Sequence, residues 1–125
     1  MKENEIAKSL VDLFYRIHVQ YGPGLLESVY EAALKYELGK ACFKIRSQIG
    51  IPVIYEEQDL GLGFKLDLIV NETVIIEIKS VEAIAAVHYK QLTTYLRLSK
   101  KKLGLLINFN SASLTDSIKR VANGL

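Results

Sequence analysis

Cysteine is almost missing from this sequence, in which Cys42 stands alone among 125 residues. A single cysteine excludes an internal disulfide and a zinc site built from several cysteines, and we expect Cys42 to be a small residue near the core. Long apolar runs are also missing, since none approaches the ~20 residues of a membrane span. Residues 1–9 are mostly polar and charged, which predicts no signal peptide and a cytoplasmic protein without membrane contact.

A large excess of one charge is absent as well. The 16 Lys and Arg residues against 14 Asp and Glu give a net charge of +2, which by itself does not indicate nucleic-acid binding. Half of the residues are hydrophobic and 24% are charged, as in an ordinary globular protein. Because there is no repeat, low-complexity segment or linker, residues 1–125 are expected to form one domain.

Several catalytic motifs do not occur. There is no phosphate-binding P-loop, and Gly61-Leu62-Gly63 is too short to be a dinucleotide fingerprint. No nucleophile motif accompanies the lone cysteine, so a protease-like triad has no support.

The spacing of hydrophobic residues predicts helices over residues 4–20, 25–40, 83–98 and 114–122, and strands over 43–56, 62–70, 74–80 and 103–109. A turn is expected at residues 58–61. The apolar face of the second helix is assigned to Leu25, Val29, Ala32, Ala33 and Tyr36. A helix between strands indicates a crossover onto a mixed sheet, so the expected class is α/β or α+β.

Two charged residues interrupt an otherwise apolar strand at residues 74–79. Glu77 and Lys79 are two positions apart and point to the same face, and Asp67 on the preceding strand is the obvious partner. Two carboxylates and a lysine suit a hard cation such as Mg²⁺ or Mn²⁺, with the lysine orienting a water molecule. The alternative is an exposed edge pair with one surface salt bridge.

The connection between the two strands decides whether the acids meet. A two-residue turn at Asn71-Glu72 places Asp67 opposite Ile76, whereas a three-residue loop over residues 71–73 places it opposite Glu77. In residues 62–70, Phe64, Leu66, Leu68 and Val70 are expected on one face, and Lys65, Asp67 and Ile69 on the other. The metal hypothesis therefore predicts the three-residue register or an equivalent bulge.

Helical residues supply further candidates. Glu27 lies on the same narrow side of its helix as Tyr30 and Leu34, while Glu31 is expected further round, towards solvent. The alternative for Glu27 is a first-turn acid that interacts favourably with the helix dipole. Gln91, Tyr95 and His88 form one stripe of the third long helix, although each also suits a helix surface or a core edge.

Other charged residues have a role only as candidates. His18 is expected to be a structural histidine. The basic residues suit contacts with phosphates, or simply a solvated surface; they are Lys44, Arg46, Lys65, Lys100, Lys101, Lys102, Lys119 and Arg120.

The segment Gly24-Leu-Leu-Glu27-Ser-Val-Tyr30 resembles the signature of the GxxExxY family, a branch of the PD-(D/E)XK nuclease superfamily. The likeness covers most of the chain and is specific as an ordered set. It extends to Tyr21-Gly-Pro-Gly, Phe64-Lys-Leu-Asp67-Leu-Ile-Val70, Ile76-Glu77-Ile-Lys79, Val87-His88, Gln91-Leu-Thr-Thr-Tyr95 and Gly104-Leu-Leu-Ile-Asn-Phe-Asn110.

The resemblance implies a restriction-endonuclease-like αβββαβ core with a mixed four-stranded sheet flanked by helices, preceded by an extra helix. It also implies roles for particular residues. Asp67, Glu77, the carbonyl of Ile78 and Glu27 would bind metal, Lys79 would orient water, and Gln91 with Tyr95 would form the QxxxY element of RecB-type nucleases, with Tyr30 and His88 in support. Leu66 stands where the superfamily has proline, but the aspartate that does the chemistry is present.

These roles imply a nuclease dependent on Mg²⁺ or Mn²⁺ that hydrolyses phosphodiester bonds, with DNA favoured over RNA. The alternatives are a nuclease-fold module that binds nucleic acid or a partner protein without cutting, and a dimeric accessory protein with no nucleic-acid role. A small catalytic domain often needs a second subunit to embrace a duplex, so a homodimer is also an expectation.

Overall fold

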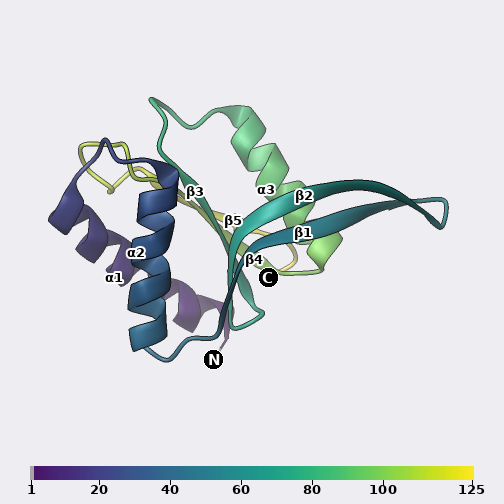
Figure 1. The fold of residues 1–125 in the computed structure, drawn as a ribbon, viewed down its shortest axis with the longest axis horizontal. Helices are drawn as coiled ribbons and strands as arrows, with labels where there is room; N and C mark the ends of the chain where they lie inside the picture. Colours follow the sequence, from purple (N-terminus) through teal and green to yellow (C-terminus); the bar gives the residue numbers. More distant parts are fainter. Residues whose placement is uncertain (1) are drawn as a thin grey trace.

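The computed structural model describes residues 2–125, and of Leu62 the backbone only. Within them the chain forms three helices and five strands (Figure 1). In sequence order these are α1 (Glu3–Tyr21), α2 (Glu27–Lys40), β1 (Ile45–Tyr55), β2 (Gln58–Val70), β3 (Val74–Lys79), α3 (Ala86–Ser99), β4 (Leu103–Asn108) and β5 (Ile118–Ala122). No helix in this described part is both long and apolar enough to cross a membrane.

The strands form one sheet in the order β1-β2-β3-β4-β5. β3 and β4 are parallel and are joined by the crossover helix α3, while the other neighbouring pairs are antiparallel. The expected α/β fold with a mixed sheet is therefore confirmed. The sheet has one strand more than the four expected.

The fifth strand replaces a helix that was wrongly expected at residues 114–122. Ile118–Ala122 is extended and pairs with β4, after a turn that holds Leu114 in the core. The apolar positions in this segment fit helical spacing, but the outer edge of the buried strand β4 needs hydrogen-bond partners for its backbone.

The turn expected at residues 58–61 is also misplaced. The β1–β2 hairpin turns at Glu56 and Glu57, which both have positive φ, and Tyr55 pairs directly with Gln58. Two central residues of positive φ are the geometry of a tight hairpin turn, so β2 begins earlier than expected.

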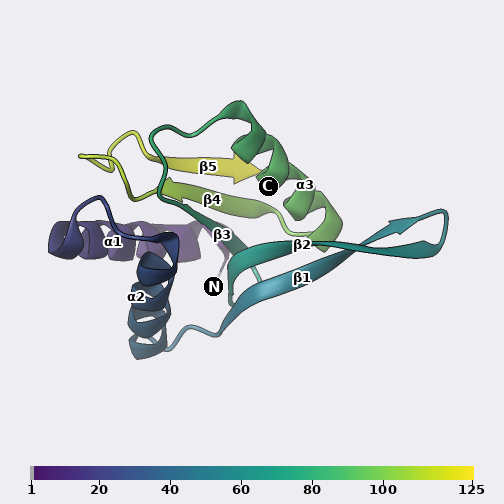
Figure 2. The ribbon, with the colours of Figure 1, turned by 45° about the horizontal axis from the view of Figure 1, so that its top comes forward.

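Helices cover both faces of the sheet (Figures 1 and 2). On one face, Phe14 of α1 and Leu34 of α2 join a core with Ile76 and Leu105. On the other face, Leu92 and Leu96 of α3 join a second core; its sheet residues include Ile75 and Leu106. The sheet centre is therefore closed to water, and polar chemistry has room only at its ends.

The buried face of α2 differs from the expected one. Tyr30, Leu34 and Leu38 face the sheet, whereas Val29 is 42% exposed and Tyr36 is 68% exposed. The helix carries two apolar stripes, and periodicity alone does not say which one meets the sheet. Leu25 and Ala33 are partly buried against the core, as expected, while Ala32 is exposed.

Cys42 is exposed, in the turn after α2, and not near the core. It has a φ of 64°, a backbone conformation that belongs to the turn and directs the side chain outward. His18 is half-buried, and its Nε2 lies 2.7 Å from the carbonyl oxygen of Ser111, which fits the expected structural role.

β2 leaves β3 partway along the sheet. Their ladder pairs only Leu68–Val70 with Val74–Ile76, and beyond it β2 continues with β1 as a long hairpin that projects from the body (Figure 2). Leu68 and Val70 face the α1–α2 core, but Leu66 and Phe64 face α3, so the single face expected for these four residues is wrong. The strands twist between Leu66 and Leu68, where Gln48 on β1 has a φ of 50°.

Candidate metal centre

Asp67 and Glu77 lie opposite each other where β2 parts from β3. Val70 pairs with Val74 across a loop of three residues, so the register that brings the two acids together is confirmed. The backbone N–H of Asp67 donates to Glu77 Oε1 over 3.2 Å, and that of Ile78 donates to Asp67 Oδ2 over 2.7 Å. The carboxylates thus take the place of ladder hydrogen bonds as the strands diverge.

Each of the two carboxyl groups affects the ionisation of the other. Glu77 is only 5% exposed. Burial, followed by the charge of Asp67, raises the pKa of Glu77 to about 8. Burial also raises the pKa of Asp67, against the lowering effects of the Ile78 hydrogen bond and the charge of Lys79. Two buried acids that resist ionising together are a place where a cation is favoured.

Lys79 ends β3, two positions beyond Glu77 and on the same side of the strand. It is half-buried, and its charge lowers the pKa of both carboxyl groups. It therefore lies within electrostatic reach of the pair and supplies one positive charge against two negative ones.

The donor set fits a hard divalent cation. Asp67 and Glu77 each use one carboxylate oxygen for a backbone N–H, which leaves the second oxygen of each for a ligand. Carboxylate and carbonyl oxygens are the ligands that Mg²⁺ prefers, and Mg²⁺ usually keeps several waters. Among the described residues no group of three or more His, Cys, Asp or Glu is arranged to hold a metal, so the remaining positions would fall to the Ile78 carbonyl and to water.

Glu27 reaches the same end of β3 from the first turn of α2. Its Oε2 accepts a hydrogen bond of 3.2 Å from the Ser80 N–H, and the Ser80 hydroxyl donates to the Leu25 carbonyl over 2.7 Å. Its negative charge contributes to the raised pKa of Asp67. Glu27 thus reaches the edge of the sheet, as expected, but it stays exposed and its hydrogen-bond partner is Ser80.

Tyr30 fixes the segment that leads into α2. Its ring is fully buried and stacks on Phe109, with centroids 4.3 Å apart. Its hydroxyl donates to the Gly22 carbonyl over 2.5 Å and accepts from the Leu25 N–H over 3.2 Å. Tyr30 thereby holds the loop that places Glu27 at the start of the helix.

Glu31 and Gln48 also belong to this site, which the sequence did not indicate. Glu31 is half-buried, not turned to solvent as expected, and accepts a hydrogen bond of 2.7 Å from Gln48 Nε2. With Asp67, Glu27 and others they line a cavity of about 250 Å³. The four-residue spacing of Glu27 and Glu31 is the sequence feature that could have indicated Glu31, since residues four apart share a helix face.

α3 carries the remaining candidates. Burial, followed by the charges of Glu77 and Asp67, raises the pKa of Tyr95. Gln91, one turn earlier on the same helix, is exposed. His88 has a local structural role. Its Nδ1 accepts a 3.0 Å hydrogen bond from the Ala85 N–H and so caps the start of α3.

The candidate phosphate-binding residues gather elsewhere. Lys100, Lys101 and Lys102 precede β4, and β4 begins opposite Val74, the first residue of β3. Arg46, near the same end, forms a two-pronged ion pair with Glu72 and is 54% exposed. In the same region, the backbone N–H of Lys44 donates to the Asn71 side chain. Lys65 lies apart from this group, on the part of β2 that forms the projecting hairpin with β1. Lys119 and Arg120 lie on β5, on the far side of β4.

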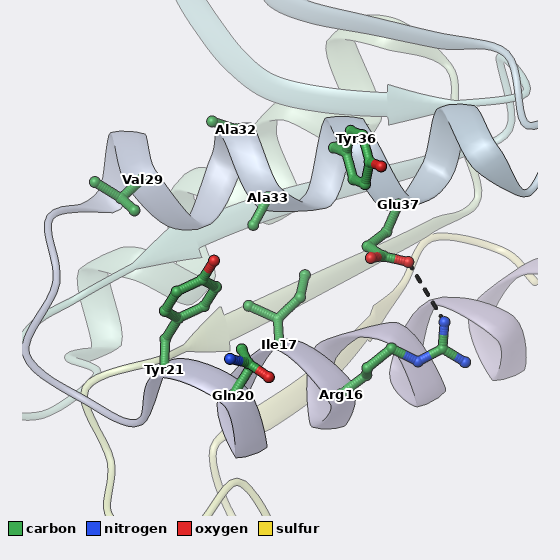
Figure 3. A pocket seen from close by; sticks show the side chains of 9 residues that line it. All are labelled: Arg16, Ile17, Gln20, Tyr21, Val29, Ala32, Ala33, Tyr36 and Glu37. Atoms are coloured by element: carbon green, nitrogen blue, oxygen red, sulfur yellow. Dashed lines mark hydrogen bonds and ion pairs between the residues drawn. The ribbon is translucent and has the colours of Figure 1, made fainter.

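A larger cavity, of about 600 Å³, is separate from this centre. It opens between α1 and α2 and is lined by Ile17, Val29, Ala33 and Tyr36, with the Arg16–Glu37 ion pair at one end (Figure 3). The second apolar stripe of α2 is found here, which explains why sequence periodicity selected it. None of its lining residues belongs to the candidate centre.

A family profile described as the PD-(D/E)XK nuclease superfamily matches residues 4–121. No curated protein and no solved structure matches the chain. Among the helices and strands, the match leaves out only the first residue of α1 and the last residue of β5.

Proposed function

The chain belongs to the PD-(D/E)XK nuclease superfamily, and we propose that it is a Mg²⁺- or Mn²⁺-dependent nuclease that hydrolyses phosphodiester bonds in DNA or RNA. The observation that carries the proposal is that Asp67 and Glu77 lie opposite each other at the point where β2 separates from β3. Each acid is anchored by a backbone N–H from the opposite strand, and Lys79 lies beside them. A pair of anchored acids next to a lysine is suited to a metal-assisted hydrolysis.

In this proposal Asp67, Glu77 and the Ile78 carbonyl would hold the cation. A bound divalent cation would neutralise charge on the scissile phosphate and make water more acidic. Lys79 donates a hydrogen bond that orients the attacking water, and burial of the site keeps these groups in a fixed geometry. Glu27 and Gln91 flank the site from α2 and α3, where they orient further water molecules, and Tyr95 restricts solvent on the α3 side.

We also assign the chain to the GxxExxY branch. The support is the segment from Gly24 to Tyr30, whose ends have structural roles. Gly24 has a φ of 102°, which favours glycine, and Tyr30 ties the same loop together. Glu27 between them points to the end of β3.

A nuclease-fold module that binds nucleic acid without cutting is the second candidate. The observation that favours it is the position of the basic residues Lys44, Arg46 and Lys100–Lys102, which gather near the start of β3 and not around Lys79. Binding through that surface would depend on salt and would survive removal of divalent metal.

Cleavage assays distinguish the two candidates. Single- and double-stranded DNA and RNA are incubated with Mg²⁺ or Mn²⁺ and the wild type, Asp67→Asn, Glu77→Gln or Lys79→Ala. Glu72→Gln and Lys8→Ala are matched controls, since both residues are exposed and lie outside the centre. The nuclease is supported if Asp67→Asn, Glu77→Gln and Lys79→Ala lose cleavage while the two controls keep it. Cleavage that persists in Asp67→Asn refutes the nuclease. If neither the wild type nor any variant cleaves, but nucleic acid is bound in a salt-dependent way, the second candidate is supported.

A further inference from the structure

Asn108 is a buried polar residue without a place in the proposed chemistry. It ends the apolar strand β4, opposite Lys79, and is 3% exposed. In the described part of the chain only Glu77 and Asn108 are both polar and buried. A buried amide is costly unless its hydrogen bonds are made, so its partners indicate its role.

The side chain of Asn108 bonds mainly to the segment that leaves β3, and its Oδ1 also accepts from the Asn110 N–H over 3.2 Å. Its Oδ1 accepts from the Val81 N–H over 3.1 Å, and its Nδ2 donates to the Val81 carbonyl over 2.9 Å. The side-chain amide thus binds Val81 as a neighbouring strand would. Asn110 adds a second donor to the Val81 carbonyl, over 3.2 Å.

The same segment is bound on its other side by α2. Ser80 donates from its N–H to Glu27 and from its hydroxyl to the Leu25 carbonyl. One residue earlier, the Lys79 carbonyl accepts from the Phe109 N–H over 2.9 Å. Residues 79–81 are therefore held between β4 and the start of α2.

We propose that Asn108 is a positioning residue of the candidate centre: it holds Val81 so that Ser80 presents its N–H to Glu27 and Lys79 keeps its place beside Glu77. This inference rests on the proposed function. Asn108 touches neither substrate nor metal in it, and it acts through Ser80 and Lys79. A residue that orients ligands in this way typically changes metal affinity by 10–100-fold when it is replaced.

The chemistry of the site selects asparagine. Aspartate would keep the bond from the Val81 N–H but would set a carboxylate oxygen against the Val81 carbonyl, which has no proton to give. Leucine would fill the space and leave both polar groups of Val81 without this partner. Asn108→Asp therefore keeps the shape of the side chain and removes the bond from Nδ2 to the Val81 carbonyl.

Asn123 offers a matched control near the opposite end of β4. Its Nδ2 donates to the Lys101 carbonyl over 3.0 Å, so it too binds a segment next to β4 through one amide. Asn123→Asp removes one bond of the same kind away from the centre. Because Asn108 is 3% exposed and Asn123 is half-buried, the thermal midpoint of each variant is measured as well, and a positioning role weakens Mn²⁺ binding in Asn108→Asp alone.

Three quantities are measured for the wild type and both variants: the Mn²⁺ dissociation constant by calorimetry, the thermal midpoint, and amide hydrogen exchange at Ser80 and Val81 by NMR. For Asn108→Asp we expect roughly tenfold weaker Mn²⁺ binding and faster exchange at both amides. For Asn123→Asp we expect wild-type values of both. Asn108→Ser, which keeps a neutral side chain, is a second variant if Asn108→Asp does not fold.

Wild-type Mn²⁺ affinity in a folded Asn108 variant overturns the inference, as does an equal loss in Asn123→Asp. If the wild type itself binds no Mn²⁺, the proposed function fails. In that case exchange at Ser80 and Val81 still decides whether Asn108 holds this segment, because unchanged exchange would show that it does not.

Discussion

Asp67 Oδ2 accepts a hydrogen bond of 2.7 Å from the Ile78 N–H, and the backbone of Asp67 in turn donates to the Glu77 carboxylate. This reciprocal pair sits where β2 and β3 separate, so the strands diverge without leaving these N–H groups unsatisfied. The same bonds hold two acidic groups close together, although each disfavours ionisation of the other. The hydrogen bonds at this point stabilise the fold, whereas the proximity of two buried acids disfavours their ionisation. Acids with pKa values shifted in this way are typical of functional sites.

Asp67→Asn removes one of the two like charges and keeps an oxygen that can accept from the Ile78 N–H. We expect the protein without metal to gain unfolding free energy, because burial and the nearby acids disfavour the ionised form of Asp67 in the folded state and raise its pKa. Mn²⁺ affinity should fall at least tenfold, roughly the effect of losing one charged ligand. Urea unfolding and calorimetry on one preparation measure both. A variant that loses stability and keeps metal binding would contradict the assignment.

Glu77 should make stability depend on pH. Its pKa is raised to about 8 by burial and by Asp67, so the folded protein holds this proton more tightly than the unfolded chain, where the ordinary value is 4.5. The folded state therefore loses stability as pH rises from about 4.5 to about 8, and the loss is complete above that range. We expect unfolding free energy without metal to be at least about 1 kcal/mol lower at pH 8.5 than at pH 5.5.

Denaturant unfolding at these two pH values, with and without Mn²⁺, measures this effect. Metal binding should reduce the fall, because the cation favours both ionised carboxylates. Glu77→Gln removes the titrating group and should flatten the profile, while Glu72→Gln should leave it unchanged. A wild type whose stability rises over this range would show that another group dominates.

The centre was predictable because its residues violate the pattern around them. Glu77 and Lys79 stand out in an apolar strand, and the length of the loop before Val74 limits Asp67 to two registers. Gln48 joins the site through a local twist with positive φ, which no residue pattern signals. The strand at Ile118–Ala122 forms because the edge of β4 needs a partner, a tertiary demand that overrides local helical spacing.

Tyr30→Phe tests whether the loop before α2 places Glu27. The ring can keep its stacking on Phe109, but the hydroxyl bonds to Gly22 and Leu25 are lost. We expect a loss of about 1–2 kcal/mol in unfolding free energy and a clear drop in cleavage at saturating Mn²⁺. Tyr36→Phe, on the exposed side of the same helix, is the control and should change neither quantity.

Gly104→Ala tests how closely α3 must approach the sheet. An added Cβ at Gly104 would lie 2.8 Å from Leu92 Cδ1, so the Leu92 side chain, which packs α3 on the sheet, has to shift. Overpacking of this kind costs about 1–3 kcal/mol. Gly50→Ala is the control, since a Cβ there meets nothing within 4 Å and its φ is not positive.

Leu92→Ala relieves the same contact from the other side. Alone it should destabilise the protein by about 2–5 kcal/mol, because it leaves a cavity in the core beneath α3. Combined with Gly104→Ala, it should cost less than the sum of the two single changes, since the new methyl group enters the space that Leu92 vacates. Urea unfolding of the four proteins measures this coupling. Additive losses would mean that Leu92 does not set the distance between α3 and β4.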